Sequence, residues 1–171
     1  MVARRGQRTG PKLMGGGVYE SGRQSSKRMF TVEQQTRVAA SPEEVFAFLD
    51  DPRNHVKITP GLIEVSNVEA LPDGGKRAEY RYKLAGVTLV GTVEDSERSP
   101  GSELVQDLSG AIDGTISYRF EVEDGTTDLQ YEAAYDLPDT VIESVLAPIA
   151  EAYNRREAEA TVENLKTFLE H

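Results

Sequence analysis

The sequence predicts an α+β fold in which one antiparallel sheet of about seven strands carries its helices on one side. Two observations lead to this prediction. Short segments that alternate apolar and polar residues follow one another, separated by turn signals such as Pro60-Gly61 and Asp124-Gly125. The last segment, residues 139–171, instead repeats apolar residues at spacings of three, four and seven, which is typical of a long amphipathic helix. A sheet and a helix that each have one apolar face pack against each other.

The first strand and two short helices come before the rest of the sheet. Residues 30–39 alternate and predict the strand. Ser41 and Glu44, with a proline directly after the serine, provide an N-cap, a proline at the first helical position and a capping box. This predicts a short helix. Residues 52–60 predict a second helical turn or two, which the Pro-Gly pair ends.

Six further strands are expected, joined by tight turns. The turns are indicated by Gly, Pro and Asp residues between the alternating segments. The clearest pair is the last hairpin, because both of its arms place apolar or aromatic residues at every second position. The strands are expected at residues 63–71, 77–84, 87–97, 104–108, 116–122 and 129–135.

The terminal helix is expected to start at Thr140, which forms a capping box with Glu143. Pro148 lies beyond the first turn of a helix that starts there. An interior proline removes one backbone hydrogen bond and clashes with the preceding turn, at a cost of about 3 kcal/mol. We therefore expect a kink or break near Ala147.

Length and composition exclude several kinds of protein. The 171 residues suffice for one domain with a core and are too few for two ordinary ones. Without cysteine there are no disulfides, thiolate metal ligands or cysteine nucleophiles. No apolar segment approaches the roughly 20 residues that span a bilayer, and no apolar leader follows the basic N-terminus. We expect a soluble, cytoplasmic protein without integral membrane association, as a monomer or weak homodimer.

Charge is distributed unevenly along the chain. The whole chain has 19 basic and 29 acidic residues, of which residues 1–28 hold seven basic ones and only one acidic one, Glu20. Residues 29–171 therefore hold 12 basic and 28 acidic residues, a net charge of −16. So acidic a domain disfavours nucleic acid and anionic membranes as partners. It resembles proteins from a salt-rich, halophilic cytoplasm. An ordinary acidic protein is the alternative.

Residues 1–28 form a basic segment without apolar periodicity, so we expect a disordered extension before the domain at residues 29–171. Translated upstream sequence before Met29 is favoured over a nucleic-acid arm or an import sequence. His171 at the other end is compatible with the remainder of a purification tag.

Three short segments carry a resemblance to a known superfamily. They are residues 40–46 (ASPEEVF) at the first helix, residues 51–54 (DPRN) before the second and residues 112–120 (IDGTISYRF) in the sixth strand; residues 163–166 add a weaker match. From Met29 onward the chain resembles the START-like helix-grip superfamily, also called SRPBCC, and within it the polyketide cyclase/dehydrase and lipid-transport family. The resemblance implies a curved sheet wrapped around the C-terminal helix, with two short helices after the first strand. It also implies a deep apolar cavity for lipids, sterols, quinones or polyketides.

The sequence gives an independent reason to expect a cavity, because a kinked helix does not press flat on a curved sheet. If Ile116 and Tyr118 face inward, alternation places further residues on the same face. Tyrosines are the most informative of these, since a buried phenol needs a polar partner. A filled core and a register error of one residue are the competing interpretations. The expected sheet residues are Gln34, Thr36, Tyr80, Tyr82, Leu89, Gln106, Ile116, Tyr118, Tyr131 and Tyr135. On the terminal helix, the residues expected to form the lid of the cavity are Leu146, Ile149 and Tyr153.

No reactive constellation is evident, and no catalytic residue, metal or cofactor is assigned. His55 is the only internal histidine and lies in a polar segment, which favours a surface position over a role as a base. No histidine spacing typical of zinc occurs. Carboxylates are so numerous that no acid/base pair stands out.

Three functions are compatible with these observations. The preferred one is binding or transport of a small hydrophobic ligand (lipid, quinone or polyketide-like) without evident catalysis. The second is a polyketide cyclase or dehydratase, which needs an inward acid or base with a perturbed pKa. The third is an accessory or interaction protein, related to the accessory group associated with carbon-monoxide dehydrogenase or to the co-chaperone branches, for which a filled cavity and a broad apolar patch are expected.

Overall fold

The computed structural model describes residues 28–139, 141 and 147–170. Seven antiparallel strands form one open sheet in the order β1-β7-β6-β5-β4-β3-β2. The strands are β1 (Arg28–Val38), β2 (Leu62–Ala70), β3 (Lys76–Leu84), β4 (Val87–Ser99), β5 (Glu103–Gly110), β6 (Asp113–Glu123) and β7 (Thr126–Leu137). The helices are α2 (Pro42–Leu49), the 3₁₀ turn η1 (Pro52–Asn54), α3 (His55–Ile58) and α5 (Ala147–Leu169). The predicted α+β fold is confirmed.

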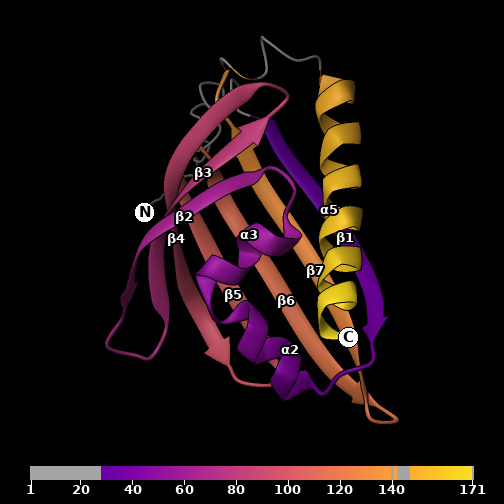
Figure 1. The fold of residues 1–171 in the computed structure, drawn as a ribbon. Helices are drawn as coiled ribbons and strands as arrows, with labels where there is room; N and C mark the ends of the chain where they lie inside the picture. The colour runs from indigo at the N-terminus through magenta and orange to yellow at the C-terminus, as the bar shows by residue number, and fades with distance from the viewer. Residues whose placement is uncertain (1–27, 140, 142–146, 171) are drawn as a thin grey trace, which may run out of the picture.

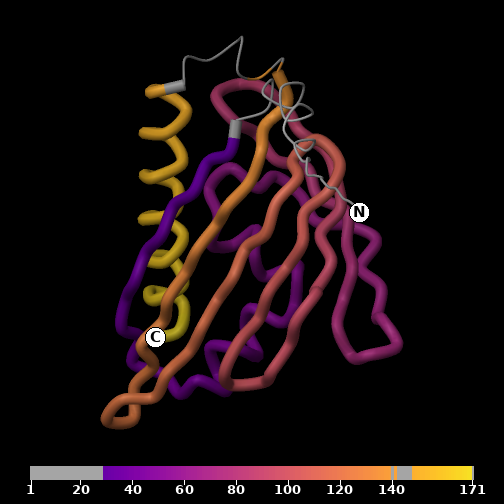
Figure 2. The backbone as a smooth tube through the Cα atoms, turned by 180° about the vertical axis from the view of Figure 1, so that it is seen from behind, coloured from indigo at the N-terminus to yellow at the C-terminus, as the bar shows by residue number. Residues whose placement is uncertain are grey.

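The sheet curves and holds its helices on one side (Figure 1). The long helix α5 packs mainly against the edge strand β1, and α3 contacts α5. The chain crosses from β1 at one edge to β2 at the other through α2, η1 and α3. Figure 2, seen from behind, shows the other face of the sheet in front of the helices. The layered arrangement therefore has one enclosed face, where a site can form.

Alternation along the strands sets which residues face the helices. In β1, positions 32, 34, 36 and 38 are buried or half-buried, whereas positions 31, 33, 35 and 37 are exposed. β7 pairs with both β1 and β6, so Ala133 lies opposite Val32 on one side and Ile116 on the other. Gly91 lets β4 and β5 approach closely, because a Cβ there would lie 2.2 Å from the Ser109 carbonyl oxygen. The inward register predicted from the sequence is the one observed.

The start of α2 is the capping box that the sequence predicts. The Ser41 hydroxyl accepts from the Glu44 amide at 3.2 Å, and the Ser41 amide donates to Glu44 Oε1 at 3.0 Å. At the other end of α2, Asp50 accepts from Arg98 Nε at 2.9 Å and Nη2 at 2.7 Å and lies 3.1 Å from Lys76 Nζ. These bonds tie α2 to β3 and β4. The hydrogen bonds from Arg98 are the main reason why the pKa of Asp50 lies below its ordinary value, against the effect of burial.

The terminal helix α5 runs from Ala147 to Leu169, and Asp139 and Val141 before it are also helical. Pro148 is the second residue of α5, and the kink or break expected near Ala147 involves residues that lie outside the described ones. The expected start at Thr140 and its capping box lie outside the described residues, as do the N-terminal extension up to residue 27 and His171. Arg28, the last residue of the expected extension, begins β1.

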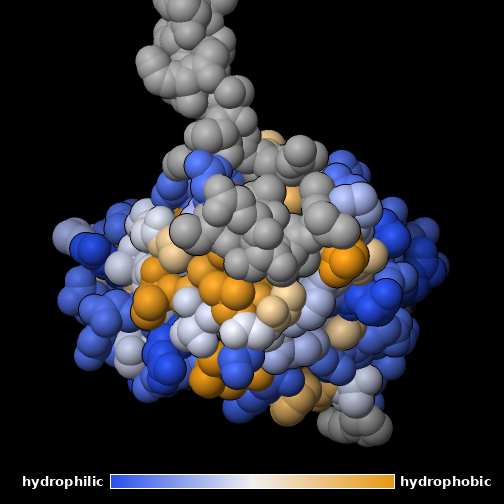
Figure 3. All heavy atoms as spheres, turned by 90° about the horizontal axis from the view of Figure 1, so that it is seen from above, coloured by the Kyte–Doolittle hydropathy of each residue, from blue (hydrophilic) through white to orange (hydrophobic). Residues whose placement is uncertain are grey.

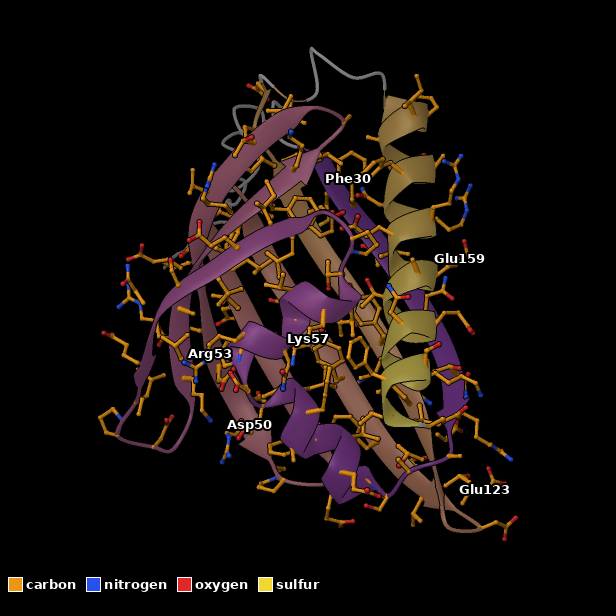
Figure 4. All side chains as sticks on the ribbon, in the orientation of Figure 1. Phe30, Asp50, Arg53, Lys57, Glu123 and Glu159 are labelled. Carbon is orange, nitrogen blue, oxygen red and sulfur yellow. The ribbon has the colours of Figure 1, made fainter. Side chains whose placement is uncertain are left out.

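Two apolar clusters fill the space between sheet and helices (Figure 4). The lower cluster joins α2 and the C-terminal part of α5 to the sheet and contains Phe46, Leu104 and Leu165. The upper cluster contains Phe30, Leu84 and other residues from both edges of the sheet. Tyr118 and Tyr131 belong to the lower cluster, Tyr80, Tyr82 and Tyr135 belong to the upper one, and all five line a cavity.

Candidate ligand-binding cavity

A largely apolar cavity of about 120 Å³ lies between α5 and the inner face of the sheet. Its walls come from all seven strands, from the η1–α3 segment and from α5. Seven of the thirteen residues that the sequence singled out lie together on its lining: Tyr80, Tyr82, Gln106, Ile116, Tyr118, Tyr131 and Tyr135.

The other sheet residues lie elsewhere. Leu89 is buried in the upper apolar cluster but is not on the cavity lining. Gln34 faces inward and lines a second hollow, between β1 and α5. Thr36 is half-buried on the same side of β1 and lines neither hollow. At this end of β1, α5 packs directly on the strand, so the inward direction alone does not bring a side chain to the cavity.

Of the helix residues expected as a lid, Ile149 and Tyr153 are not on the described lining of the cavity. Ile149 is 56% exposed, because α5 turns its other side to the sheet. Tyr153 is half-buried, packs against the upper cluster and donates to the Lys83 carbonyl at 3.3 Å. Leu146 lies outside the described residues. The α5 residues on the lining are Asn154, Glu157 and Ala158.

Those α5 residues explain why space remains there. Ala158 is small, and Asn154 and Glu157 are polar, whereas one to two turns later Val162 is buried and Leu165 belongs to the lower cluster. Across from them, large aromatic rings hold the walls apart; the Tyr118 and Tyr131 rings meet edge to face at 5.4 Å. Small residues opposite large, rigid ones leave a void that the backbone cannot close.

Glu157 is the one acidic side chain on the described lining, and sequence reasoning missed it. Its Oε1 accepts from the Gly61 amide at 3.1 Å, and its Oε2 accepts from the Tyr82 hydroxyl. Burial raises its pKa, and these two hydrogen bonds act in the opposite direction. Glu157 thus links α5, β3 and the turn before β2. Its position four residues after Tyr153 and four before Thr161 in the inward phase of the helix was the available signal.

Burial keeps the cavity tyrosines neutral, and the Tyr82 hydroxyl donates to Glu157. Burial raises the pKa of Tyr80 to about 12. Burial also raises the pKa of Tyr82, Tyr131 and Tyr135, and the nearby Glu157 carboxylate adds to the rise. A phenolate nucleophile is therefore strongly disfavoured in this cavity.

His55 is buried, so its predicted surface position is wrong. Only 8% of the residue is exposed; its Nε2 donates to the Leu49 carbonyl at 2.8 Å, and its ring meets Tyr118 edge to face at 5.9 Å. Burial lowers the pKa of His55, so the ring is neutral at pH 7. The bond to a carbonyl six residues earlier is what draws this residue of a polar segment inward.

Two inward amides differ in their partners. Gln106 donates from Nε2 to Asp95 Oδ1 at 3.1 Å, while Asp95 Oδ2 accepts from the Lys76 amide at 2.9 Å. Asp95 is buried and was not singled out from the sequence. Asn154 is 5% exposed, and neither its Nδ2 nor its Oδ1 has a hydrogen-bond partner. The Tyr80 hydroxyl is also unpartnered, but it lies close over the backbone of Gly91 at the sheet. Asn154 is therefore a residue of the described lining whose amide donor and acceptor both lack a hydrogen-bond partner.

Two further properties concern the described part of the chain. Residues 28–139, 141 and 147–170 contain no group of three or more His, Asp or Glu side chains that could hold a metal ion. No described helix combines the length and apolar content that a bilayer crossing needs.

A sheet curved around one C-terminal helix, with a cavity between them, defines a domain of the helix-grip class. Residues 29–170 match the family model described as polyketide cyclase/dehydrase and lipid transport, and the chain belongs to this family. The resemblance read from the sequence is confirmed. None of the curated proteins compared with the chain matches it.

Solved structures share the fold at low sequence identity. A START superfamily protein from Mycobacterium smegmatis is 14% identical, with a TM-score of 0.68 over 81% of this chain and 96% of that one. The di-domain ARO/CYC BexL from the BE-7585A biosynthetic pathway is 19% identical, with a TM-score of 0.65 over 84% of this chain and 50% of that one. The Aha1 dimer from Colwellia psychrerythraea is 13% identical, with a TM-score of 0.57 over 82% and 96%.

Proposed function

We propose that this protein binds a small hydrophobic ligand, built on a single ring, in the cavity between the sheet and α5. The observation that carries the proposal is a mostly apolar cavity of about 120 Å³ between the sheet and α5. Interiors are normally close-packed, with few voids larger than a water molecule. A dry apolar cavity of about 150 Å³ is known to take up benzene, so this one is close to the size of one ring.

Size limits the ligand. A quinone ring or one ring of a polyketide is of the right size, whereas a lipid chain needs the walls to move apart. The Glu157 bonds to Gly61 and Tyr82 hold α5 to the turn before β2, so they are the contacts that such a movement would break. We therefore favour a compact ring ligand over a long acyl chain.

Binding without catalysis is our first choice, because the described residues of the lining include no nucleophile with an adjacent base. The neutral His55 uses Nε2 for the Leu49 carbonyl, and the tyrosines have raised pKa values. One observation favours the cyclase or dehydratase alternative: Glu157 is an inward acid whose pKa burial raises. The match to an ARO/CYC structure is compatible with that alternative. If the protein is such an enzyme, Glu157→Gln abolishes turnover; as a carrier, the variant still binds ligand.

An accessory or interaction protein, the remaining alternative, would need apolar side chains on its surface. Figure 3 shows hydrophobic atoms among hydrophilic ones at the end of the molecule that carries the β3–β4 hairpin and the start of α5. A filled interior was the other expectation for such a protein, and the cavity argues against it.

We also propose that the protein works in a cytoplasm rich in salt. The strong negative charge of residues 29–171 suits a cytoplasm rich in salt, where ions screen repulsion between carboxylates.

Native mass spectrometry of the full chain, purified at high salt, tests the proposed function. We expect a bound species that adds the mass of a small organic molecule and leaves on mild activation. A matched sample of Ala133→Val, which narrows the cavity, should carry less of it. Protein that is free of any such species, and that takes up no benzene when benzene is added, contradicts the proposal.

A further inference from the structure

Asn154 has an unsatisfied amide inside the cavity wall. It is 5% exposed, it lines the cavity as well as the hollow beside β1, and both its Nδ2 and its Oδ1 are buried without a hydrogen-bond partner. Buried side-chain polar atoms are partnered in the large majority of cases. A buried amide without partners is destabilising unless something supplies one donor and one acceptor.

The charges around Asn154 narrow what that partner can be. Glu157 follows three residues later on the same side of α5 and is on the cavity lining. Its two oxygens already accept from Tyr82 and from the Gly61 amide, and each keeps a further lone pair. No Lys or Arg is on the described lining of the cavity, so nothing there neutralises an anion. A ligand carboxylate would therefore meet Glu157 without a counter-charge.

A hydroxyl group fits these constraints better than other common groups. It donates one hydrogen bond and accepts another, which is what a carboxamide needs, and it carries no charge. A plain hydrocarbon leaves Asn154 unsatisfied. A ketone accepts from Nδ2 but leaves Oδ1 without a donor.

We propose that the ligand is a neutral ring compound with a hydroxyl group, a phenol, an enol or an alcohol, whose hydroxyl binds to Asn154 next to Glu157. The apolar part of the ring then lies against Ile116, Tyr118 and Ala133 on the sheet. This inference rests on the proposed function, because it names the polar group of the ligand that the cavity takes.

Isothermal titration of the full chain with phenol, benzene and benzoate tests the inference, since the three probes share one ring and differ in the polar group. We expect phenol to bind about tenfold more tightly than benzene, the amount that one to two hydrogen bonds to a buried amide contribute. We expect benzoate to bind at least about tenfold more weakly than phenol, because its charge is buried without a partner.

Two variants assign the preference to Asn154. Asn154→Leu has a similar size and no amide; we expect it to keep benzene and to lose the preference for phenol. Glu159→Leu makes a similar apolar change on the exposed side of α5 (Figure 4) and should keep the preference. Equal binding of phenol and benzene to the wild type, or tightest binding of benzoate, overturns the inference and leaves the proposed function standing. Failure of all three probes to bind overturns both.

Discussion

Ala133→Val tests the proposal that the cavity between the sheet and α5 takes up a ring ligand. Ala133 is buried in β7, on the cavity lining, between Val32 and Ile116 of the neighbouring strands. Valine adds two methyl groups to that space. At about 0.8 kcal/mol each, they raise the free energy of unfolding by up to about 1.6 kcal/mol.

The two methyl groups that Ala133→Val adds should also weaken the binding of a ring ligand. Overpacking costs about 1–3 kcal/mol, which corresponds to a roughly 5- to 150-fold weaker affinity for benzene. Urea denaturation with and without benzene, together with titration calorimetry, measures both effects. The control is Ala134→Val, on the opposite face of the same strand and opposite Thr31 and Thr115. If Ala133→Val behaves as the control does, or is destabilising while benzene binding is unchanged, the reasoning about the cavity is refuted.

Three further predictions concern charged groups. Asp50→Asn should lower the free energy of unfolding by about 1.5–3 kcal/mol, because the hydrogen bonds between Asp50 and Arg98 are charge-assisted and half-buried. Asp51→Asn changes a more exposed ion pair and should lower it by less than about 1 kcal/mol. Urea denaturation of both variants measures the difference. Burial raises the pKa of Glu157 in the folded state, so the folded state binds this proton more tightly than the unfolded chain, and the free energy of unfolding falls as the pH rises through the folded pKa. The free energy of unfolding of Glu157→Gln should therefore increase relative to that of the wild type from about pH 4.5 toward neutrality. Parallel stability profiles of the two proteins would contradict this. Raising KCl from about 0.1 M to about 1 M shortens the screening length from about 10 Å to about 3 Å, so the Tm should rise; an unchanged or lower Tm speaks against the proposed adaptation to salt.

The fold could be predicted from the sequence because its signals are local. Alternation marks each strand and its inward side, the Ser41–Glu44 capping box marks the start of α2, and Gly, Pro and Asp residues mark the turns. The same alternation brought Tyr80, Tyr118 and Tyr131 to the correct face.

The helix side of the cavity could not be predicted in the same way. Apolar periodicity finds the residues of a helix that fill a core, whereas the α5 residues at the cavity are polar or small because they do not fill it. Periodicity therefore predicts Ile149, which is 56% exposed, as a lining residue and does not point to Glu157. His55 was misplaced for another reason: a contact with the Leu49 carbonyl buries it, and no local pattern reports such a contact.

The most direct test of ligand binding in this cavity is a crystal structure of the protein soaked with phenol. We predict a ring in the space between α5 and the sheet, with its hydroxyl oxygen within hydrogen-bond distance of Asn154 and its ring against Ile116 and Tyr118. A structure in which side chains close this space, or in which phenol binds only elsewhere, would contradict the account.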